Sequence, residues 1–289
     1  MVVWIPLADE MPGSFSVFPP GDTHLGNPLF REKPLRRFID YVLTKKHAVV
    51  GWGGDLIETI APGDKRYKIK AVDPTKTRAD LQWRAFLALA DPLKDRTEWV
   101  LQGNHEDKIE NIVDVTNEIA LGLDAVNGNV MAKIDFGCFR LFDWHGWGRC
   151  NSRAGDPRQR RTNEEIFVKR QMRDQAGDCD VMVMHHIHKM YVHKPTSQLV
   201  MTHDANVPGG GLRGRYTQPT RIPLPDERYY IPEEHRWYAS SGSFLGAQDE
   251  TGTFSPYTEK FGLPPVDLGC VEIIVKNDKL QGVKRRVFE

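Results

Sequence analysis

The chain has 289 residues, 40% of them hydrophobic and 10% aromatic, which is enough apolar material for the core of one large domain. Its 39 lysine and arginine residues balance 39 aspartate and glutamate residues, which excludes a strong overall field toward nucleic acid or an anionic membrane. The four cysteines form no CxxC pair, which argues against a disulfide framework and a zinc-thiolate site.

The beginning of the chain does not resemble a targeting segment. Residues 1–7 are apolar, but this segment is short, acidic residues follow it, and it lacks the basic flank of a signal peptide. No apolar stretch approaches the roughly 18 residues that a membrane span needs. The sequence therefore predicts a cytoplasmic protein without a membrane partner.

Helical and strand-like apolar segments alternate through the first two thirds of the chain. Apolar side chains recur at helical spacing in residues 35–43 and 81–89. A strand-like apolar run follows each of these segments, at residues 48–52 and 99–101. A third and weaker helical pattern covers residues 109–119.

Two short strands and another helix are predicted next. Residues 130–134 and 139–142 have the pattern of a hairpin. Thr162 and Glu165 have the spacing of a capping box, which predicts that a helix begins there. The apolar run at 181–184 predicts a further strand that leads directly into a histidine cluster.

Extended segments dominate the last third. Residues 199–202 and 237–240 predict strands, and residues 271–275 and 280–287 predict a hairpin with its turn at Asn277-Asp278.

The proline, glycine and arginine content of residues 205–235 predicts a long loop, and its position after the last histidine cluster would let it cover a site there. Helices and strands that alternate first, followed mainly by strands, predict an α/β sandwich. We expect residues 1–289 to form a single domain.

Five short clusters of aspartate, asparagine and histidine close or follow the strand-like runs. On extended backbone, residues two positions apart point to the same side, so Asp22 and His24 would face one cavity, as would His186 and His188. A glycine near the ligand allows the chain to turn sharply at the end of a strand. In chain order the clusters are Asp22-Thr23-His24, Gly54-Asp55, Gly103-Asn104-His105-Glu106, His145-Gly146 and His186-Ile187-His188.

These side chains suit two adjacent divalent metal ions. Carboxylate, imidazole and amide ligands without thiolate favour Mn, Fe, Zn, Ni or Co, and Mg is also compatible. A carboxylate such as Asp55 can bridge two ions. Two ions about 3.5–4 Å apart would clamp a phosphate and generate hydroxide from a bound water near neutral pH. The clusters therefore predict a dinuclear metal hydrolase, with Mn as the favoured ion.

The five clusters resemble the ordered motifs of the calcineurin-like metallophosphoesterase superfamily over residues 22–188, and Ser241-Gly242-Ser243 is similar to a glycine-serine turn of that family. The resemblance implies a four-layer α/β/β/α sandwich of two mixed sheets flanked by helices. It implies that His105 donates a proton to the leaving group, and that Asp55 and Asn104 are also catalytic. It further implies two metal sites, one formed by Asp22, His24, Asp55 and His188 and the other by Asp55, Asn104, His145 and His186.

The chain departs from the family pattern at two places. His185 stands where the last motif usually has glycine, and we expect it either to change the backbone turn or to contact substrate. Leu56-Ile57-Glu58 replaces the further aspartate and arginine of phosphoprotein phosphatases, which weakens that assignment.

The segment 149–174 carries eight basic residues against four acidic ones. A groove for a phosphate backbone and a solvated, charge-mixed helix are equally compatible with this pattern. Because Arg149 and Arg153 follow His145 closely, they are candidate substrate-binding residues together with His185.

The sequence thus predicts a phosphodiesterase for a nucleic acid or a nucleotide. Metal-bound hydroxide would attack phosphorus, and His105 would protonate the departing oxygen. Two alternatives remain open. One is a phosphomonoesterase, including a protein phosphatase. The other is a catalytically silent scaffold of the same fold that binds a partner through residues 205–235.

Overall fold

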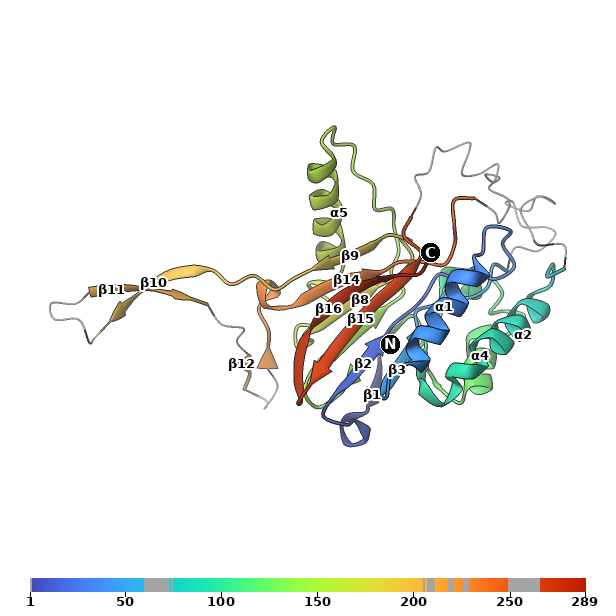
Figure 1. The fold of residues 1–289 in the computed structure, drawn as a ribbon, viewed down its shortest axis with the longest axis horizontal. Coiled ribbons are helices and arrows are strands. Elements are labelled where there is room, and N and C mark those ends of the chain that lie inside the picture. The colour runs from blue at the N-terminus through green and yellow to red at the C-terminus, as the bar shows by residue number, and fades with distance from the viewer. Residues whose placement is uncertain are drawn as a thin grey trace.

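The computed structural model describes residues 2–59, 73, 75–204, 206, 211–217, 221–225, 229–248 and 266–289. Two mixed six-stranded sheets form its centre (Figure 1). In spatial order, the first sheet contains β16 (Lys279–Val287), β15 (Gly269–Lys276), β2 (Phe15–Phe18), β3 (Ala48–Trp52), β4 (Thr97–Val100) and β5 (Val126–Asn127). The second contains β1 (Val3–Pro6), β6 (Met131–Asp135), β7 (Arg140–Trp144), β8 (Val181–Met184), β14 (Trp237–Ser241) and β9 (Met190–His193).

Helices cover the outer faces of both sheets. Figure 1 shows α1 (Glu32–Leu43), α2 (Ala79–Ala90) and α4 (Val115–Leu123) together on one side and α5 (Pro157–Met172) apart from them. The described helices are α1 (Glu32–Leu43), α2 (Ala79–Ala90), α3 (Asn104–Asp107), α4 (Val115–Leu123) and α5 (Pro157–Met172), with 3-10 turns at Ala8–Glu10, Asp91–Arg96 and Glu233–His235. No helix among the described residues combines the length and the apolar character needed to cross a membrane.

Three apolar clusters separate the layers. In the first, Phe38 of α1, Phe86 of α2 and Ile119 of α4 pack against the first sheet. The second lies between the sheets and joins Trp99 to Val181. In the third, side chains of α5 pack on the outer face of the second sheet. The order helices, sheet, sheet, helix confirms the predicted four-layer α/β/β/α sandwich.

Burial on both faces explains why the strands are continuous apolar runs. Adjacent residues of β3 point to opposite sides, so that Val49 joins the cluster between the sheets and Val50 joins the outer one. In β8, Val181 and Val183 face the other sheet, whereas Met182 and Met184 face α5.

Several predicted elements are confirmed. The predicted strand at 181–184 is β8, and the predicted pair 130–134 and 139–142 forms the antiparallel strands β6 and β7. β15 and β16 pair antiparallel through a turn in which Asn277 and Asp278 have φ of 49° and 56°. Both values suit the turn that matches the twist of a hairpin.

Two helix predictions need correction. α5 begins at Pro157, and its N-cap is Asp156, whose Oδ1 accepts a hydrogen bond from the Gln159 backbone N–H at 2.8 Å. Thr162 and Glu165 lie inside the helix, because an earlier capping residue and a proline at its first position already start it. The single helical stretch at 109–119 is also wrong, since α4 starts only after its own N-cap at Asp114.

The predicted loop at 205–235 is partly structured. β10 (Leu199–Asp204) and β11 (Gly211–Tyr216) form an antiparallel ribbon, and β12 (Ile222–Pro223) pairs with β13 (Tyr229–Tyr230). The ribbon extends away from the two sheets (Figure 1), so it does not cover the ends of the strands as predicted. The rest of this prediction, at residues 205, 207–210, 218–220 and 226–228, lies outside the described residues.

Candidate metal centre

The predicted ligands come from the carboxyl ends of five strands. Asp22, Asp55 and Asn104 follow β2, β3 and β4, which are neighbours and parallel in the first sheet. His145 and His186 follow β7 and β8, which are parallel neighbours in the second sheet. Because parallel strands end at the same edge, all five loops meet at one end of the sandwich.

One group of ligand atoms consists of Asp22, His24 and His188. His188 Nε2 lies 3.3 Å from Asp22 Oδ1 and 3.1 Å from His24 Nε2. Two imidazole nitrogens this close cannot both present a lone pair without repulsion unless a proton or a metal ion lies between them. A cation between the two nitrogens would remove this repulsion.

A second group consists of Asp55, His145 and His186. Asp55 Oδ2 lies 3.5 Å from His145 Nε2 and 3.7 Å from His24 Nε2. Asn104 contributes an amide oxygen, Oδ1, 3.4 Å from His145 Nε2. One carboxylate oxygen thus faces both groups at once.

Unpaired polar atoms test whether this arrangement fits metal ions. His186 Nδ1 is buried and forms no hydrogen bond with the described residues, and Asp22 Oδ1 has only the nearby His188 Nε2 at 3.3 Å. A buried polar atom without a partner costs about 1–3 kcal/mol, and a metal ion held here would supply the missing interaction. Together with a donor set of carboxylate, imidazole and amide, these two atoms fit two divalent ions.

The electrostatics of the site favour positive charge. Burial opposes ionisation of Asp55, but protonated His145 and its neighbours outweigh it and hold the pKa of Asp55 well below its usual range. Burial likewise opposes protonation of the histidines. The carboxylates nevertheless raise the pKa of His24 to about 9 and that of His145 to about 10. The carboxylates therefore make this site attractive to cations.

Backbone and carboxylate groups behind the site orient two of the imidazoles. His24 Nδ1 lies 3.1 Å from Glu58 Oε2, and His145 Nδ1 lies 2.7 Å from the Gly53 carbonyl oxygen. Each acceptor holds the proton on Nδ1, which turns Nε2 toward the site. Sequence reasoning noted Glu58 only as a departure from a phosphatase motif and missed this role.

Glu106 fastens two ligand loops together. Its carboxylate accepts hydrogen bonds from the backbone N–H of Asp55 at 2.9 Å, Leu56 at 2.7 Å and Gly103 at 2.9 Å. Burial and the nearby Asp55 raise the pKa of Glu106 to about 6. A Cβ on Gly103 would lie 2.1 Å from Asp55 N, so only glycine allows this approach.

The backbone of the ligands is not extended, which corrects the predicted reason for their convergence. Left-handed φ values occur at Asp22 (50°), His24 (49°), Asp55 (49°), His186 (70°) and His188 (55°). Each such residue costs on the order of 1–3 kcal/mol and persists only where its surroundings enforce it. At Asp22 the carbonyl oxygen accepts hydrogen bonds from Ser243 Oγ at 2.8 Å and Phe244 N at 3.1 Å.

His105 lies beside the first group. Its backbone N–H donates to Asp55 Oδ1 at 2.8 Å, and its Nδ1 lies 2.6 Å from the Glu58 carbonyl oxygen. The centroid of its ring is 4.6 Å from that of His24. Burial and protonated His24 lower the pKa of His105 to about 4.

His185, the first of the candidate substrate residues, lies in the interior against a ligand loop. The side chain is fully buried, and its Nε2 lies 2.9 Å from Asp143 Oδ1. Trp99 Nε1 donates to the other oxygen of Asp143 at 2.8 Å. A Cβ on Gly53 would lie 2.1 Å from the His185 ring, so the imidazole packs directly beneath a ligand loop.

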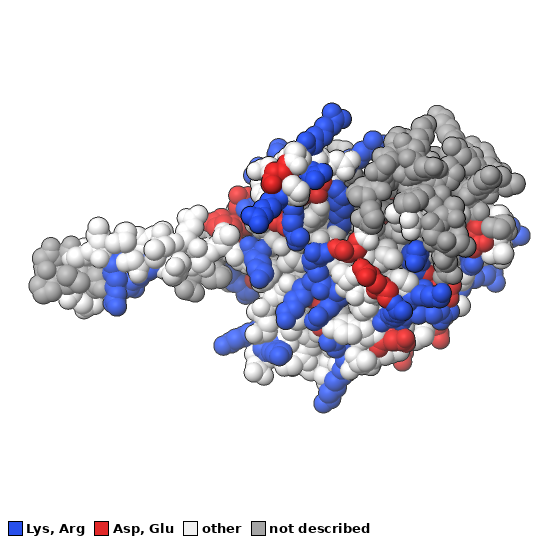
Figure 2. Space-filling model, turned by 45° about the horizontal axis from the view of Figure 1, so that its top comes forward, with Lys and Arg blue, Asp and Glu red and all other residues white. Residues whose placement is uncertain are grey.

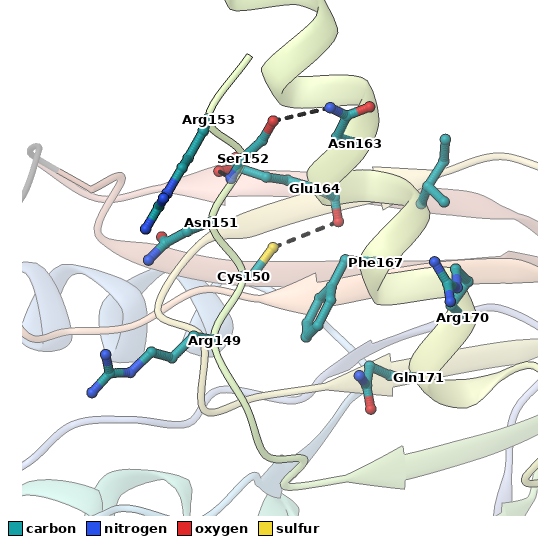
Figure 3. A pocket seen from close by; sticks show the side chains of 11 residues that line it. Arg149, Cys150, Asn151, Ser152, Arg153, Asn163, Glu164, Phe167, Arg170 and Gln171 are labelled. Atoms are coloured by element: carbon teal, nitrogen blue, oxygen red, sulfur yellow. Dashed lines mark hydrogen bonds between the residues drawn. The ribbon is translucent and has the colours of Figure 1, made fainter.

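The other two candidate substrate residues, Arg149 and Arg153, are exposed. Both line a cavity of about 570 Å³ between residues 149–153 and α5 (Figure 3).

Comparison with known proteins adds little. No protein-family model matches the sequence. No curated protein matches it either. Among solved structures, the chain is similar to the NAD nucleotidase of Haemophilus influenzae, with 10% sequence identity and a TM-score of 0.38. The match covers 95% of this chain and 50% of that chain, so the present chain spans half the length of that protein. So distant a likeness carries no argument about activity.

Replacing Glu58 tests the support of His24. We expect Glu58→Gln to weaken Mn²⁺ binding about 10- to 100-fold, because the neutral amide holds the His24 imidazole less strongly than the carboxylate does. Titration calorimetry measures the affinity. Glu110→Gln is the matched control, since Glu110 is exposed. Equal affinity for both variants would contradict the role of Glu58.

Metal binding should release protons. Because the pKa values of His24 and His145 are about 9 and 10, both imidazoles are protonated at neutral pH and must lose a proton to bind an ion. We expect Mn²⁺ affinity to rise from about pH 6 to about pH 8. Calorimetry in buffers with different ionisation enthalpies counts the protons, and a pH-independent affinity would refute the assignment.

The same two pKa values set the stability of the metal-free fold. Because folding raises the pKa of both histidines, their protonation stabilises the folded state. This stabilisation is complete at pH values below the ordinary histidine pKa, and it is lost as the pH rises through about 9 and 10.

Proposed function

We propose that this protein is a dinuclear metal-dependent phosphoesterase that hydrolyses phosphodiesters. One observation carries the proposal: Asp55 Oδ2 lies 3.5 Å from His145 Nε2 and 3.7 Å from His24 Nε2, so that Asp55 shares one group of possible ligand atoms with His145 and His186 and another with His24 and His105. A carboxylate in this position suits a bridge between two cations. Neighbouring cations are the arrangement that phosphoryl chemistry uses to clamp a phosphate.

Seven side chains would hold the two ions. Their mixed oxygen and nitrogen donors favour Mn, with Fe, Zn, Ni, Co and Mg as further candidates. When bound, the ions would polarise the phosphate ester and activate a water molecule for attack. The first ion would be held by Asp22, His24, Asp55 and His188, and the second by Asp55, Asn104, His145 and His186.

The protein's own groups would keep the ligands ready. Glu58 and the Gly53 carbonyl fix the tautomers of His24 and His145, so that neither imidazole must rotate or change its tautomer when substrate binds. Glu106 keeps the loops of Asp55 and Asn104 at a fixed separation. Preorganised donors and acceptors of this kind lower the cost of reaching a charged transition state.

His105 would protonate the leaving oxygen. Because Nδ1 is held by the Glu58 carbonyl, proton transfer is assigned to Nε2. A pKa of about 4 leaves this imidazole neutral in the substrate-free protein at neutral pH. An anionic phosphate beside the ring favours the protonated form, so His105 would become a proton donor only in the substrate complex.

The preference for a diester rests on the surroundings of the site. Within the described residues, Arg149 and Arg153 have no ion-pair or hydrogen-bond partner. Exposed arginines next to a phosphate site suit an ester that extends beyond the scissile group.

Two substitutions separate metal binding from proton transfer. Asp55→Asn should abolish both metal loading and turnover, because the amide cannot bridge two ions as a carboxylate does. His105→Ala should retain both ions and lose about 10²- to 10⁴-fold in rate on an ester with a poor leaving group. Elemental analysis and steady-state kinetics measure the two effects. Full activity of His105→Ala on that ester would exclude it as the proton donor.

Model substrates test the reaction class. With Mn²⁺, the protein should hydrolyse bis-p-nitrophenyl phosphate faster than p-nitrophenyl phosphate, because the site is proposed to accept a diester. The reverse order would favour a phosphomonoesterase. Absence of turnover on both esters, together with absence of bound metal, would refute the proposed function.

A further inference from the structure

A cavity next to α5 has features of a binding site in its own right. It lies between residues 149–153 and α5, and it has a volume of about 570 Å³ (Figure 3). The ring of Phe167 projects from α5 toward the loop, with Gln171 below it. Cavities that hold small ligands typically measure about 300–1,000 Å³, so this one suits a single nucleotide unit and not a duplex.

Uncompensated positive charge borders the cavity. Arg149 and Arg153 extend from the loop, and Arg170 projects from α5 (Figure 3). None of the three has an ion-pair or hydrogen-bond partner within the described part of the chain. Glu164 is the one acidic residue of the lining, and Lys189 Nζ binds its Oε1 at 2.6 Å. Glu164 is therefore already paired, and the arginines remain available to an anion.

Surface charge alone does not single out this place. Figure 2 shows lysine and arginine side chains over the end of the molecule formed by α5, with acidic side chains among them. Arg161, for example, is paired with Glu165 on the surface of the helix at 2.9 Å. The cavity differs from this mixed surface because unpaired arginine side chains stand on both sides of it, Arg149 and Arg153 on the loop and Arg170 on α5, with the ring of Phe167 between them.

The cavity is fastened to the metal-binding loops. Lys189, which binds Glu164, directly follows the ligand His188. The same ammonium group donates to the Cys150 carbonyl oxygen at 2.9 Å, and Cys150 lies five residues after the ligand His145. A single lysine thus ties the cavity wall to the loops that carry both ligands, so a substrate could contact the cavity and the metal centre together.

We propose that this cavity binds the second phosphate and the adjoining base of a nucleotide-type phosphodiester whose scissile phosphate lies at the metal centre. The arginines would bind the phosphate at the rim, where a guanidinium matches phosphate oxygens. Phe167 would stack on the base, and the amides of Asn151 and Gln171 would contact its polar edge. This assignment rests on the proposed function for the position of the scissile phosphate.

Two substrates with the same scissile ester provide the test. They are the p-nitrophenyl ester of thymidine 5′-phosphate and the same compound carrying a 3′-phosphate. The 3′-phosphate should lower KM about tenfold or more in the native protein, since hydrogen bonds to charged groups are worth about 1.5–3 kcal/mol. Arg153→Ala and Arg170→Ala should reduce this advantage. Phe167→Leu should instead raise KM for both substrates, because both carry the base on which the ring would stack. Arg158→Ala should keep it, because Arg158 is an exposed arginine of α5 outside the cavity.

A binding measurement separates failure of this assignment from failure of the proposed function. Thymidine 3′,5′-bisphosphate is titrated by calorimetry into protein kept free of metal with a chelator. Native protein and Arg158→Ala should bind it at least about tenfold more tightly than Arg153→Ala or Arg170→Ala. Equal binding by all four proteins, or none by native protein, would overturn the assignment. Arginine-dependent binding without turnover would refute only the phosphoesterase.

Discussion

The buried carboxylate of Asp55 is the group around which the site is organised. It is about as deeply buried as the apolar core, and burying a charge is costly unless partners compensate it. One of its oxygens accepts the backbone N–H of His105, and the other faces the imidazoles of His24 and His145. These contacts come from three different loops and from both sheets. Compensation of one charge therefore requires the whole edge of the sandwich to be assembled correctly.

The apolar layers behind this edge of the sandwich hold the strained backbone of the ligand loops in place. Left-handed backbone at five ligands is unfavourable for each residue alone, and the loops adopt it because three apolar clusters hold the strands on which they start. Glu106 adds a local restraint, because one carboxylate binds several backbone N–H groups in neighbouring loops. Apolar packing thus provides the stabilising free energy that offsets the backbone strain, and buried polar contacts determine where each ligand points.

His185 stands where the motif pattern usually has glycine, and the fold accommodates its larger side chain in the interior. Its imidazole fills the space above Gly53 and binds Asp143, which also accepts from Trp99 of the other sheet. The Trp99–Asp143–His185 chain therefore links β4, β7 and the loop after β8 directly behind the metal centre. A buried polar link of this kind adds rigidity between the sheets at the position where ligands from both must meet.

Local pattern was sufficient for many of the strands along the chain and for the gathering of the ligand clusters, whereas the four layers were implied by the resemblance of the motifs. Apolar runs such as 181–184 must be buried on both faces, and polar residues at the ends of parallel strands must share one edge. Pattern was not sufficient for the left-handed backbone of Asp22 and His188 or for the burial of His185. Each of these depends on a partner that becomes a neighbour only after the chain folds. Tertiary contacts, which link residues distant in the sequence, therefore set the final geometry of the site.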